Sequence, residues 1–352
     1  MPFNESRSSD IAISDPKKDH RLQELKAWLC GIDGYQGAEP VPVSVDASFR
    51  RYFRVGFEDQ PRIVMDAPPA QEDCRPYLQV ATFLRAMGLN APRVFETDLE
   101  RGFLLLSDLG SMQYLDALEE DPKLADALYG DALQALATLQ RKGCEYQREL
   151  PPYDAGVLLF EMNLFKEWLC ERHLGLSFDE SELEKWRETC EFLTDNALRQ
   201  HQVFVHRDYH SRNLMLSTGE PPGILDFQDA LEGPFTYDLV SLLKDCYIRW
   251  PAERVRAWAM QFYELLADDV KALANPGRFM RHFELMGVQR QLKASGIFAR
   301  LNHRDGKTSY MYDIPRTLNY IQEIAPRYPQ LLFLARLIRE HCLPVLLREQ
   351  SG

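Results

Sequence analysis

One stretch of the sequence, residues 203–227, constrains the chain more than any other. It begins with VFVHRDYHSRN and ends with ILDF. Short apolar runs flank the polar residues, which predicts strands joined by loops that carry His206, Asp208, Asn213 and Asp226. Carboxylate and amide oxygens are ligands that magnesium prefers, and a carboxylate can accept a hydroxyl proton. The spacing therefore favours a site that binds a metal ion and handles the proton of a hydroxyl group.

The four polar residues suggest separate roles. Asp208 is the candidate catalytic residue, placed to accept a hydrogen bond from an attacking hydroxyl. Asn213 and Asp226 are the candidate magnesium ligands, and His206 is expected to support the loop rather than act as a base. In a purely structural interpretation, Asp208 and Asn213 only cap loops and His206 is a hydrogen-bonded core histidine. The combination of all four favours phosphoryl transfer, with ATP and Mg²⁺ as cofactors.

Bulk properties exclude several other classes of protein. The 352 residues suffice for two lobes, and the net charge of −12 argues against nucleic acid as a partner. The seven cysteines are scattered without a C-x-x-C pair, which fits packed thiols in a reducing compartment better than a zinc site or disulfides. The sequence has neither a membrane-length apolar run nor the pattern of a secretion signal. We therefore expect a cytoplasmic protein with no membrane contact and no obligate protein partner.

The first third of the chain has the pattern of a small β-rich lobe. Strands are predicted at 41–45, 49–55 and 62–67, a helix at 75–87, and two further strands around 93–95 and 103–106. The polar residues 1–20 are expected to form a flexible tail, followed by a short helix that ends near Gly31. These features predict a nucleotide-binding N-lobe over residues 21–109.

The remainder of the chain is mainly helical. Amphipathic stretches predict helices over 122–141, 157–174, 180–200, 237–248, 252–273, 278–300 and 316–347. Residues 204–229 interrupt this pattern as a catalytic loop, which Asp229 and Asp238 are expected to brace. The predicted fold class is α+β: a bilobal, protein-kinase-like fold, with a small β-rich N-lobe containing one main helix and a larger, mainly helical C-lobe over 110–352.

The catalytic stretch carries a family resemblance. Residues 206–213 and 224–229 resemble the aminoglycoside phosphotransferase and choline kinase superfamily. Protein kinases usually carry a glycine directly after the Asp-Phe pair that corresponds to residues 226–227. This chain has Gln228 there, which favours the small-molecule branch of the superfamily. The resemblance implies ATP- and magnesium-dependent transfer of a phosphoryl group to the hydroxyl of a small molecule.

Further segments narrow the resemblance to the bacterial anomeric sugar kinases. They are SFRRYFR at 48–54, VMDAPP at 64–69, EDCRP at 72–76, GFLLLSDLG at 102–110, LFKEW at 164–168 and GIFARL at 296–301. That family phosphorylates N-acetylmuramate and N-acetylglucosamine at the anomeric hydroxyl in peptidoglycan recycling. The resemblance implies that a nucleotide and a small amino sugar are the partners, and it leaves the preferred sugar and anomer open.

The nucleotide site is expected to use the first turn of the small lobe and the end of its last strand. Ser48 lies in that turn, and Arg51 and Arg54 follow it. Kinase-like lobes commonly carry a lysine on the third strand, but this chain has a methionine there, so a nearby arginine would have to supply the charge. Either arginine could also be an ordinary solvated strand residue. Asp108 and Leu109 are the candidate hinge, whose backbone would read an adenine edge.

Acceptor residues are expected on the helical lobe. Glu161 lies on one candidate segment, and Arg300, His303 and Asp305 lie on another that runs into a polar loop. Hydrogen bonds would recognise sugar hydroxyls, and an arginine would suit a lactyl carboxylate. Two other hypotheses remain open at this point. One is a different acceptor, such as an aminoglycoside or a choline-like alcohol, and the other is a nucleotide-binding pseudokinase, supported only by the missing lysine.

Overall fold

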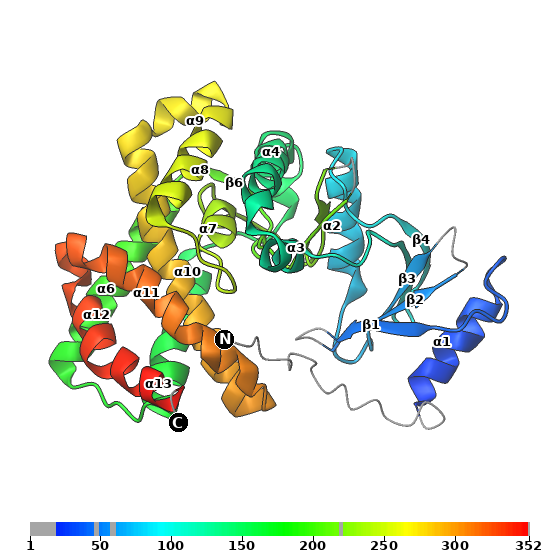
Figure 1. Cartoon of the computed structure of the whole chain (residues 1–352), viewed down its shortest axis with the longest axis horizontal. Helices are drawn as coiled ribbons and strands as arrows, with labels where there is room; N and C mark the ends of the chain where they lie inside the picture. Colours follow the sequence, from blue (N-terminus) through cyan, green and yellow to red (C-terminus); the bar gives the residue numbers. More distant parts are fainter. Residues whose placement is uncertain (1–18, 46–48, 57–60, 218–220, 351–352) are drawn as a thin grey trace. The chain divides into compact units, whose positions relative to one another are not determined.

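The computed structural model describes residues 19–45, 49–56, 61–217 and 221–350, and within them the chain divides into two compact units (Figure 1). The first unit comprises the described residues up to Thr82 together with Ala91–Leu109. The second comprises Phe83–Asn90 and the described residues from Gly110 onward. One passage between the units thus falls at the predicted lobe boundary, after Leu109. The predicted flexible tail lies almost wholly outside the described residues.

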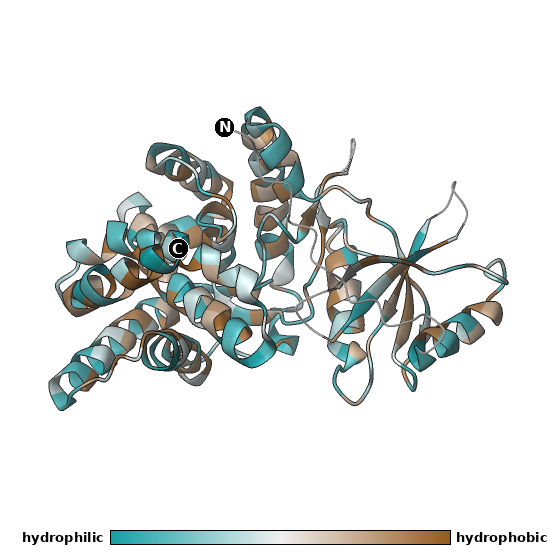
Figure 2. Cartoon of the chain, turned by 60° about the horizontal axis from the view of Figure 1, so that its bottom comes forward, coloured by the Kyte–Doolittle hydropathy of each residue, from teal (hydrophilic) through white to brown (hydrophobic). Residues whose placement is uncertain are grey.

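The first unit is built on a five-stranded antiparallel sheet. Its strands are β1 (Val41–Val45), β2 (Arg51–Val55), β3 (Arg62–Asp66), β4 (Val94–Asp98) and β5 (Phe103–Ser107), in the order β1-β2-β3-β5-β4, preceded by α1 (His20–Cys30). Phe53, Val64 and Leu105 are paired across neighbouring strands and are buried on one face. Leu25 and Leu29 of α1 pack against that face, and Figure 2 shows the strands largely in the hydrophobic colour.

The second unit is mainly helical. Its helices are α3 (Tyr114–Glu120), α4 (Ala125–Gly143), α5 (Ala155–Leu164), α6 (Glu180–Leu198), α7 (Tyr237–Leu243), α8 (Ala252–Leu265), α9 (Asp268–Leu273), α10 (Pro276–Asp305), α11 (Ile314–Ile324), α12 (Leu332–Leu337) and α13 (Leu343–Glu349). Helix α2 (Cys74–Ala86) joins the two units in sequence, because its last turn belongs to the second. The predicted α+β class is confirmed. In the described ranges, no helix is long and apolar enough to cross a membrane.

Two predicted long helices are broken in the structure. The stretch 252–273 divides into α8 and α9 at Leu266 and Ala267, which both have extended backbones. The stretch 316–347 is interrupted at Pro326 and Pro329, because proline donates no hydrogen bond and restricts the residue before it. Within 316–347 the apolar periodicity continues across the break, since α11, α12 and α13 all contribute apolar residues to one core.

Two small antiparallel strand pairs hold the catalytic stretch, and the second pair lies between the strands of the first in the sequence. Strand β6 (Gln202–Val205) pairs with β9 (Leu231–Pro234), and β7 (Leu214–Met215) pairs with β8 (Gly223–Ile224). The segment between β6 and β7 carries residues 206–213, and the segment between β8 and β9 carries Asp226. The predicted strand-and-loop pattern is therefore confirmed for this stretch.

Helix α10 runs through the core beside α5. At Gly296 the two helices approach so closely that a Cβ would lie 2.3 Å from the Leu164 carbonyl carbon. Only glycine permits that approach. The close contact allows a buried side chain of α5, Glu161, to meet side chains of α10.

Candidate active site

The catalytic stretch has an unusual backbone at two positions. Arg207 has a φ of 81° and Asp226 a φ of 58°, and within the described residues they are the only non-glycine residues with positive φ. Such conformations cost of order 1–3 kcal/mol each and persist where the surroundings hold them. One lies beside Asp208 and the other is a predicted metal ligand, so the strain is concentrated at the candidate site.

Asp238, on α7, holds the loop in this conformation. Its carboxylate accepts the backbone N–H groups of His206 at 2.6 Å and Arg207 at 2.8 Å. Burial raises the pKa of Asp238 to about 7, although these two hydrogen bonds act to lower it. The side chain is fully buried, so this is the bracing role expected for Asp238.

His206 supports the same loop from inside. It is fully buried, and its Nδ1 accepts the Asp208 backbone N–H at 3.2 Å. Burial lowers the pKa of His206 to about 4, so the imidazole is neutral at physiological pH. A neutral ring that faces the Asp208 backbone, rather than its carboxylate, fits a supporting role.

The neutral state of His206 predicts a pH dependence of stability. The unfolded chain protonates this histidine near pH 6.5, whereas the folded protein does so only near pH 4. Between these pH values the unfolded state binds more protons, so acidification lowers the free energy of unfolding by about 1.4 kcal/mol per pH unit for this group. His206→Asn keeps a hydrogen-bond acceptor but cannot titrate there. Urea unfolding from pH 7 to 4 should give a flatter profile for the variant, and parallel profiles would contradict this account.

Asp208 is surrounded by cations. Burial acts to raise the pKa of Asp208, but the charges of Lys293, Arg207 and Arg290 outweigh it and lower the pKa to about 2. The carboxylate is therefore ionised throughout the neutral range. Such a group accepts a strong hydrogen bond but is a weak proton acceptor on its own.

Asn213 and Asp226 meet beside Asp208. The Asn213 Nδ2 donates to the Asp208 carbonyl oxygen at 3.0 Å and approaches Asp226 Oδ2 at 3.4 Å. Because Nδ2 makes these contacts, Oδ1 is the amide atom left to face a cation. In the part of the chain that the structure describes, no group of three or more His, Cys, Asp or Glu side chains is arranged to hold a metal. One amide and one carboxylate oxygen fit magnesium when phosphate oxygens and water complete its shell.

Glu161 is the centre of a buried ionic cluster. It is 1% exposed, and its Oε1 lies 2.5 Å from Arg207 Nη2 and 3.3 Å from Lys293 Nζ. Its Oε2 accepts from Gln289 at 3.1 Å and from the Tyr153 hydroxyl. Burial acts to raise the pKa of Glu161, but Lys293 and Arg207 hold it below its ordinary value. Protein groups surround both oxygens, which favours positioning of the cations near Asp208 over direct contact with an acceptor.

This cluster yields a stability prediction. Glu161→Gln removes the counter-charge of the partly buried Arg207 and the buried Lys293, so the free energy of unfolding should fall by about 3 kcal/mol. The matched control is Glu184→Gln, whose partner Arg187 is exposed on α6, and it should change stability by less than about 0.5 kcal/mol. Urea unfolding of the three proteins at pH 7 measures both values. Equal effects of the two substitutions would show that the buried cluster has no special role.

Sequence reasoning missed the buried polar and cationic side chains on α10. Gln289, Arg290 and Lys293 are at most 7% exposed, in a stretch predicted only as an amphipathic helix. Lys293 Nζ also donates to the Tyr237 hydroxyl at 2.9 Å. Periodicity assigns polar residues to the solvent side of a helix and gives no sign that these residues are buried. The available signal was a polar run inside an otherwise apolar helix segment, with no separate polar face to accommodate it.

The other predicted acceptor residues lie further along α10. Arg300 follows Lys293 by seven residues, which places it on the same helix face, about 10 Å further on. His303 Nε2 lies 3.1 Å from His173 Nδ1, and Asp305 pairs with Arg304. The structure does not gather these three residues around Asp208. Their contact with an acceptor stays a prediction.

In the first unit, the predicted phosphate-binding arginines already have acidic partners. Arg51 pairs with Asp19 and Asp66, and Arg54 Nε lies 2.5 Å from Asp108 Oδ2. Met65, at the position of the expected lysine, is buried in the sheet. Leu109 follows β5 and is half-buried. Ser48 lies outside the described residues. The nucleotide contacts of these residues stay predictions.

Comparison with known proteins gives a consistent picture. Residues 39–274 match the family described as the phosphotransferase enzyme family. An N-acetylmuramate/N-acetylglucosamine kinase of Pseudomonas aeruginosa is 47% identical over 333 residues, which cover 91% of this chain and 96% of that protein. The protein of the same name from Neisseria meningitidis is 41% identical, with 91% and 96% covered.

Solved structures of similar fold are more distant in sequence. A choline kinase of Streptococcus pneumoniae has a TM-score of 0.62 at 12% identity, with 87% of this chain and 99% of that chain covered. An ADP-bound aminoglycoside phosphotransferase has a TM-score of 0.56 at 16% identity, with 86% and 97% covered. These likenesses concern the fold, and they confirm the predicted bilobal, kinase-like class.

Proposed function

Because the chain belongs to the phosphotransferase enzyme family, in the group that contains the N-acetylmuramate/N-acetylglucosamine kinases, we propose that it phosphorylates the anomeric hydroxyl of one or both of these sugars. ATP would donate the phosphoryl group, and the product would be the sugar 1-phosphate. The observation that carries the proposal is the similarity over 96% of the relative's length, which includes both units and the whole catalytic stretch. The sugar 1-phosphate would enter a cell-wall recycling route in the cytoplasm.

Asp208 would position the acceptor. Its carboxylate, ionised because its pKa is about 2, would accept a hydrogen bond from the anomeric hydroxyl and orient the oxygen for attack on phosphorus. As the new oxygen–phosphorus bond forms, the bond between the γ-phosphorus and the bridging oxygen of ATP would break, ADP would leave, and the hydroxyl proton would pass to Asp208. An anomeric hydroxyl is more acidic than an ordinary alcohol, so a weak base in the right place is sufficient.

Magnesium fits Asn213 and Asp226. The Asn213 amide oxygen and an Asp226 carboxylate oxygen would hold the ion, which when bound neutralises charge on the nucleotide phosphates. Gln228 Nε2 donates to Asp226 Oδ1 at 2.9 Å and so fixes the orientation of that carboxylate. Asp226 would then hold the ion through its other oxygen, Oδ2.

The nucleotide would bind to residues of the first unit. Asp108 and Leu109 directly follow β5, and their backbone groups would bind the edge of the base. Arg51 and Arg54 would have to exchange carboxylate partners for phosphate oxygens, which an arginine can do because both anions match its planar fork. Ser48 would contribute from the preceding turn.

An acceptor panel tests the proposed function. The purified chain with ATP and magnesium should release ADP with N-acetylmuramate or N-acetylglucosamine, and not with an aminoglycoside or choline. The proposal requires kcat/KM for an amino sugar to exceed that for the cationic acceptors by at least about 100-fold, the discrimination expected of a site built to hydrogen-bond its substrate. Preferential turnover of an aminoglycoside or choline would refute it in favour of the other acceptor class. Nucleotide binding without turnover of any acceptor would favour the pseudokinase hypothesis.

A further inference from the structure

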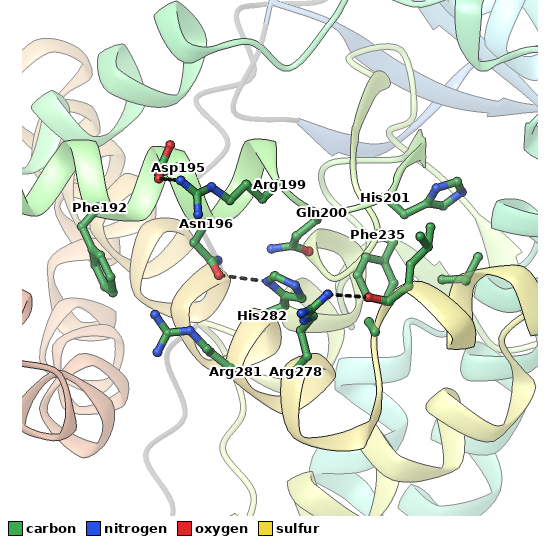
Figure 3. Close-up of a pocket in the computed structure, with 13 residues that line it drawn as sticks. Phe192, Asp195, Asn196, Arg199, Gln200, His201, Phe235, Arg278, Arg281 and His282 are labelled. Atoms are coloured by element: carbon green, nitrogen blue, oxygen red, sulfur yellow. Dashed lines mark hydrogen bonds and ion pairs between the residues drawn. The ribbon is translucent and has the colours of Figure 1, made fainter.

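A pocket separate from the candidate active site lies in the second unit. It is formed by the C-terminal end of α6, the residues that follow it, α9 and the first turns of α10, and its volume is about 520 Å³ (Figure 3). None of the residues proposed for catalysis or metal binding lines it. Its size is within the range of small-molecule sites.

Two side-chain amides line the pocket, and each has an NH₂ group without an acceptor. Asn196 is 8% exposed and Gln200 is 5% exposed, and among the described residues neither Asn196 Nδ2 nor Gln200 Nε2 has a hydrogen-bond partner. The orientation of Gln200 is fixed, because its Oε1 accepts the hydroxyl and the backbone N–H of Thr236 at 2.7 and 3.4 Å. Asn196 Oδ1 lies 2.9 Å from His282 Nδ1. Buried donors without acceptors are costly. Neighbouring atoms cover both nitrogens, so a ligand oxygen would satisfy them after a small displacement of those neighbours.

The rim of the pocket is positively charged. Arg199, Arg278 and Arg281 line it with Asp195, so the lining carries two net positive charges when its histidines are neutral. Asp195 is paired with Arg199 at 2.6 Å, whereas Arg278 and Arg281 form no ion pair with any described residue. Burial and these two arginines lower the pKa of His282 to about 4, so it stays neutral. Figure 3 shows Arg199, Arg278 and Arg281 around the two amides. This positive charge is local, on a chain of net charge −12.

We propose that this pocket is a second binding site, and that its ligand is a small phosphate monoester. A phosphate monoester carries close to two negative charges at neutral pH and three acceptor oxygens, which match the charge of the rim and the two amide donors. Phe192 and Phe235 supply apolar walls for the organic part of such a ligand. The proposal does not depend on the chemistry assigned to the active site.

The site is connected to the catalytic loop through α7. Gln200 contacts Thr236, the residue that precedes α7, and Asp238 in the first turn of that helix binds the backbone of His206 and Arg207. A ligand that binds Gln200 would therefore hold its contact with Thr236 in place, and with it the start of α7 and the catalytic loop. The site would act on the catalytic loop without contact with its substrates.

Calorimetric titration tests the binding site. Glycerol 3-phosphate is titrated into the whole chain, which is first saturated with magnesium and a non-hydrolysable ATP analogue so that phosphate sites for the nucleotide are filled. We expect one site, weakened at least about 100-fold by the double variant Arg278→Gln/Arg281→Gln, since each arginine should contribute about tenfold or more. Gln200→Glu should weaken it at least about tenfold, because it keeps the acceptor for Thr236 and replaces the donor with a negative charge.

The controls separate binding from folding. Arg256→Gln removes an exposed arginine of α8 that does not line the pocket, and it should leave the affinity unchanged. All variants should melt within a few degrees of the parent without ligand. Succinate and glycerol serve as probes of carboxylate and uncharged ligands. No binding of the phosphate, equal affinity in the double variant, or binding of succinate alone would each overturn the proposal.

Hydrogen exchange tests the connection to the loop. Glycerol 3-phosphate should slow exchange of the backbone amides of His206 and Arg207 in the parent and in Arg256→Gln, but not in the double variant. Binding with unchanged exchange at these amides would overturn the coupling through α7.

Discussion

Replacing Asp208 with asparagine is expected to lower kcat by about three orders of magnitude, with little change in nucleotide affinity. Asparagine has the same shape, but its amide carries no negative charge and cannot take up the hydroxyl proton. General-base and positioning contributions of this kind are worth about 10² to 10⁴ in rate. The nearby cations Lys293 and Arg290 would remain in place, although they would lose a counter-charge. Asp208 is not among the residues proposed to bind the nucleotide, so the substitution should lower turnover and not nucleotide affinity.

The measurement is steady-state turnover together with the dissociation constant of an ATP analogue. Asp131→Asn is the matched control, since it makes the same chemical change at an exposed position on α4, away from the catalytic loop. It should retain turnover within about threefold of the parent, as is usual for surface changes. Turnover of Asp208→Asn within tenfold of the parent would remove Asp208 from the catalytic role.

Asp226→Asn is expected to lower kcat at least about 100-fold at ordinary magnesium concentrations and to raise the half-saturating magnesium concentration at least about tenfold. An amide oxygen is a weaker ligand for a hard cation than a carboxylate. The backbone should tolerate the change, because asparagine enters the left-handed region that Asp226 occupies, with a φ of 58°, as readily as aspartate does.

A magnesium titration of turnover distinguishes a lost ligand from a damaged fold. High magnesium should restore part of the activity of Asp226→Asn, whereas a folding defect would not respond to the ion. The parent and Asp131→Asn should give superimposable magnesium curves. A magnesium dependence in Asp226→Asn equal to that of the parent would exclude the residue as a ligand.

The catalytic stretch was predictable because its chemistry is local in sequence. His206, Asp208 and Asn213 lie within one loop, and short flanking apolar runs mark the strands that hold it. The strands of the small lobe were predictable for the same reason, since alternation and turn residues are short-range signals. The sequence could not reveal the left-handed backbone of Arg207, which depends on hydrogen bonds to Asp238, 31 residues away.

The ionic cluster behind the loop could not be derived from the sequence. Glu161 and Lys293 are separated by more than a hundred residues, and they meet because α5 and α10 approach closely at Gly296. Tertiary packing buries the polar residues of α10, which contradicts the rule that polar residues face solvent. Periodicity also gave no sign of the breaks in the helix predicted over 316–347. The apolar pattern continues there, because the short helices on either side of the prolines pack into one core.

The most direct test of the central claim is to identify the phosphorylated atom by phosphorus NMR of a reaction containing ATP, magnesium and N-acetylmuramate, with N-acetylglucosamine in parallel. The account predicts a new phosphate ester resonance coupled to the anomeric proton, absent with Asp208→Asn and absent with the methyl glycoside, which lacks a free anomeric hydroxyl. A phosphate ester at any other hydroxyl, or turnover of the methyl glycoside, would contradict it.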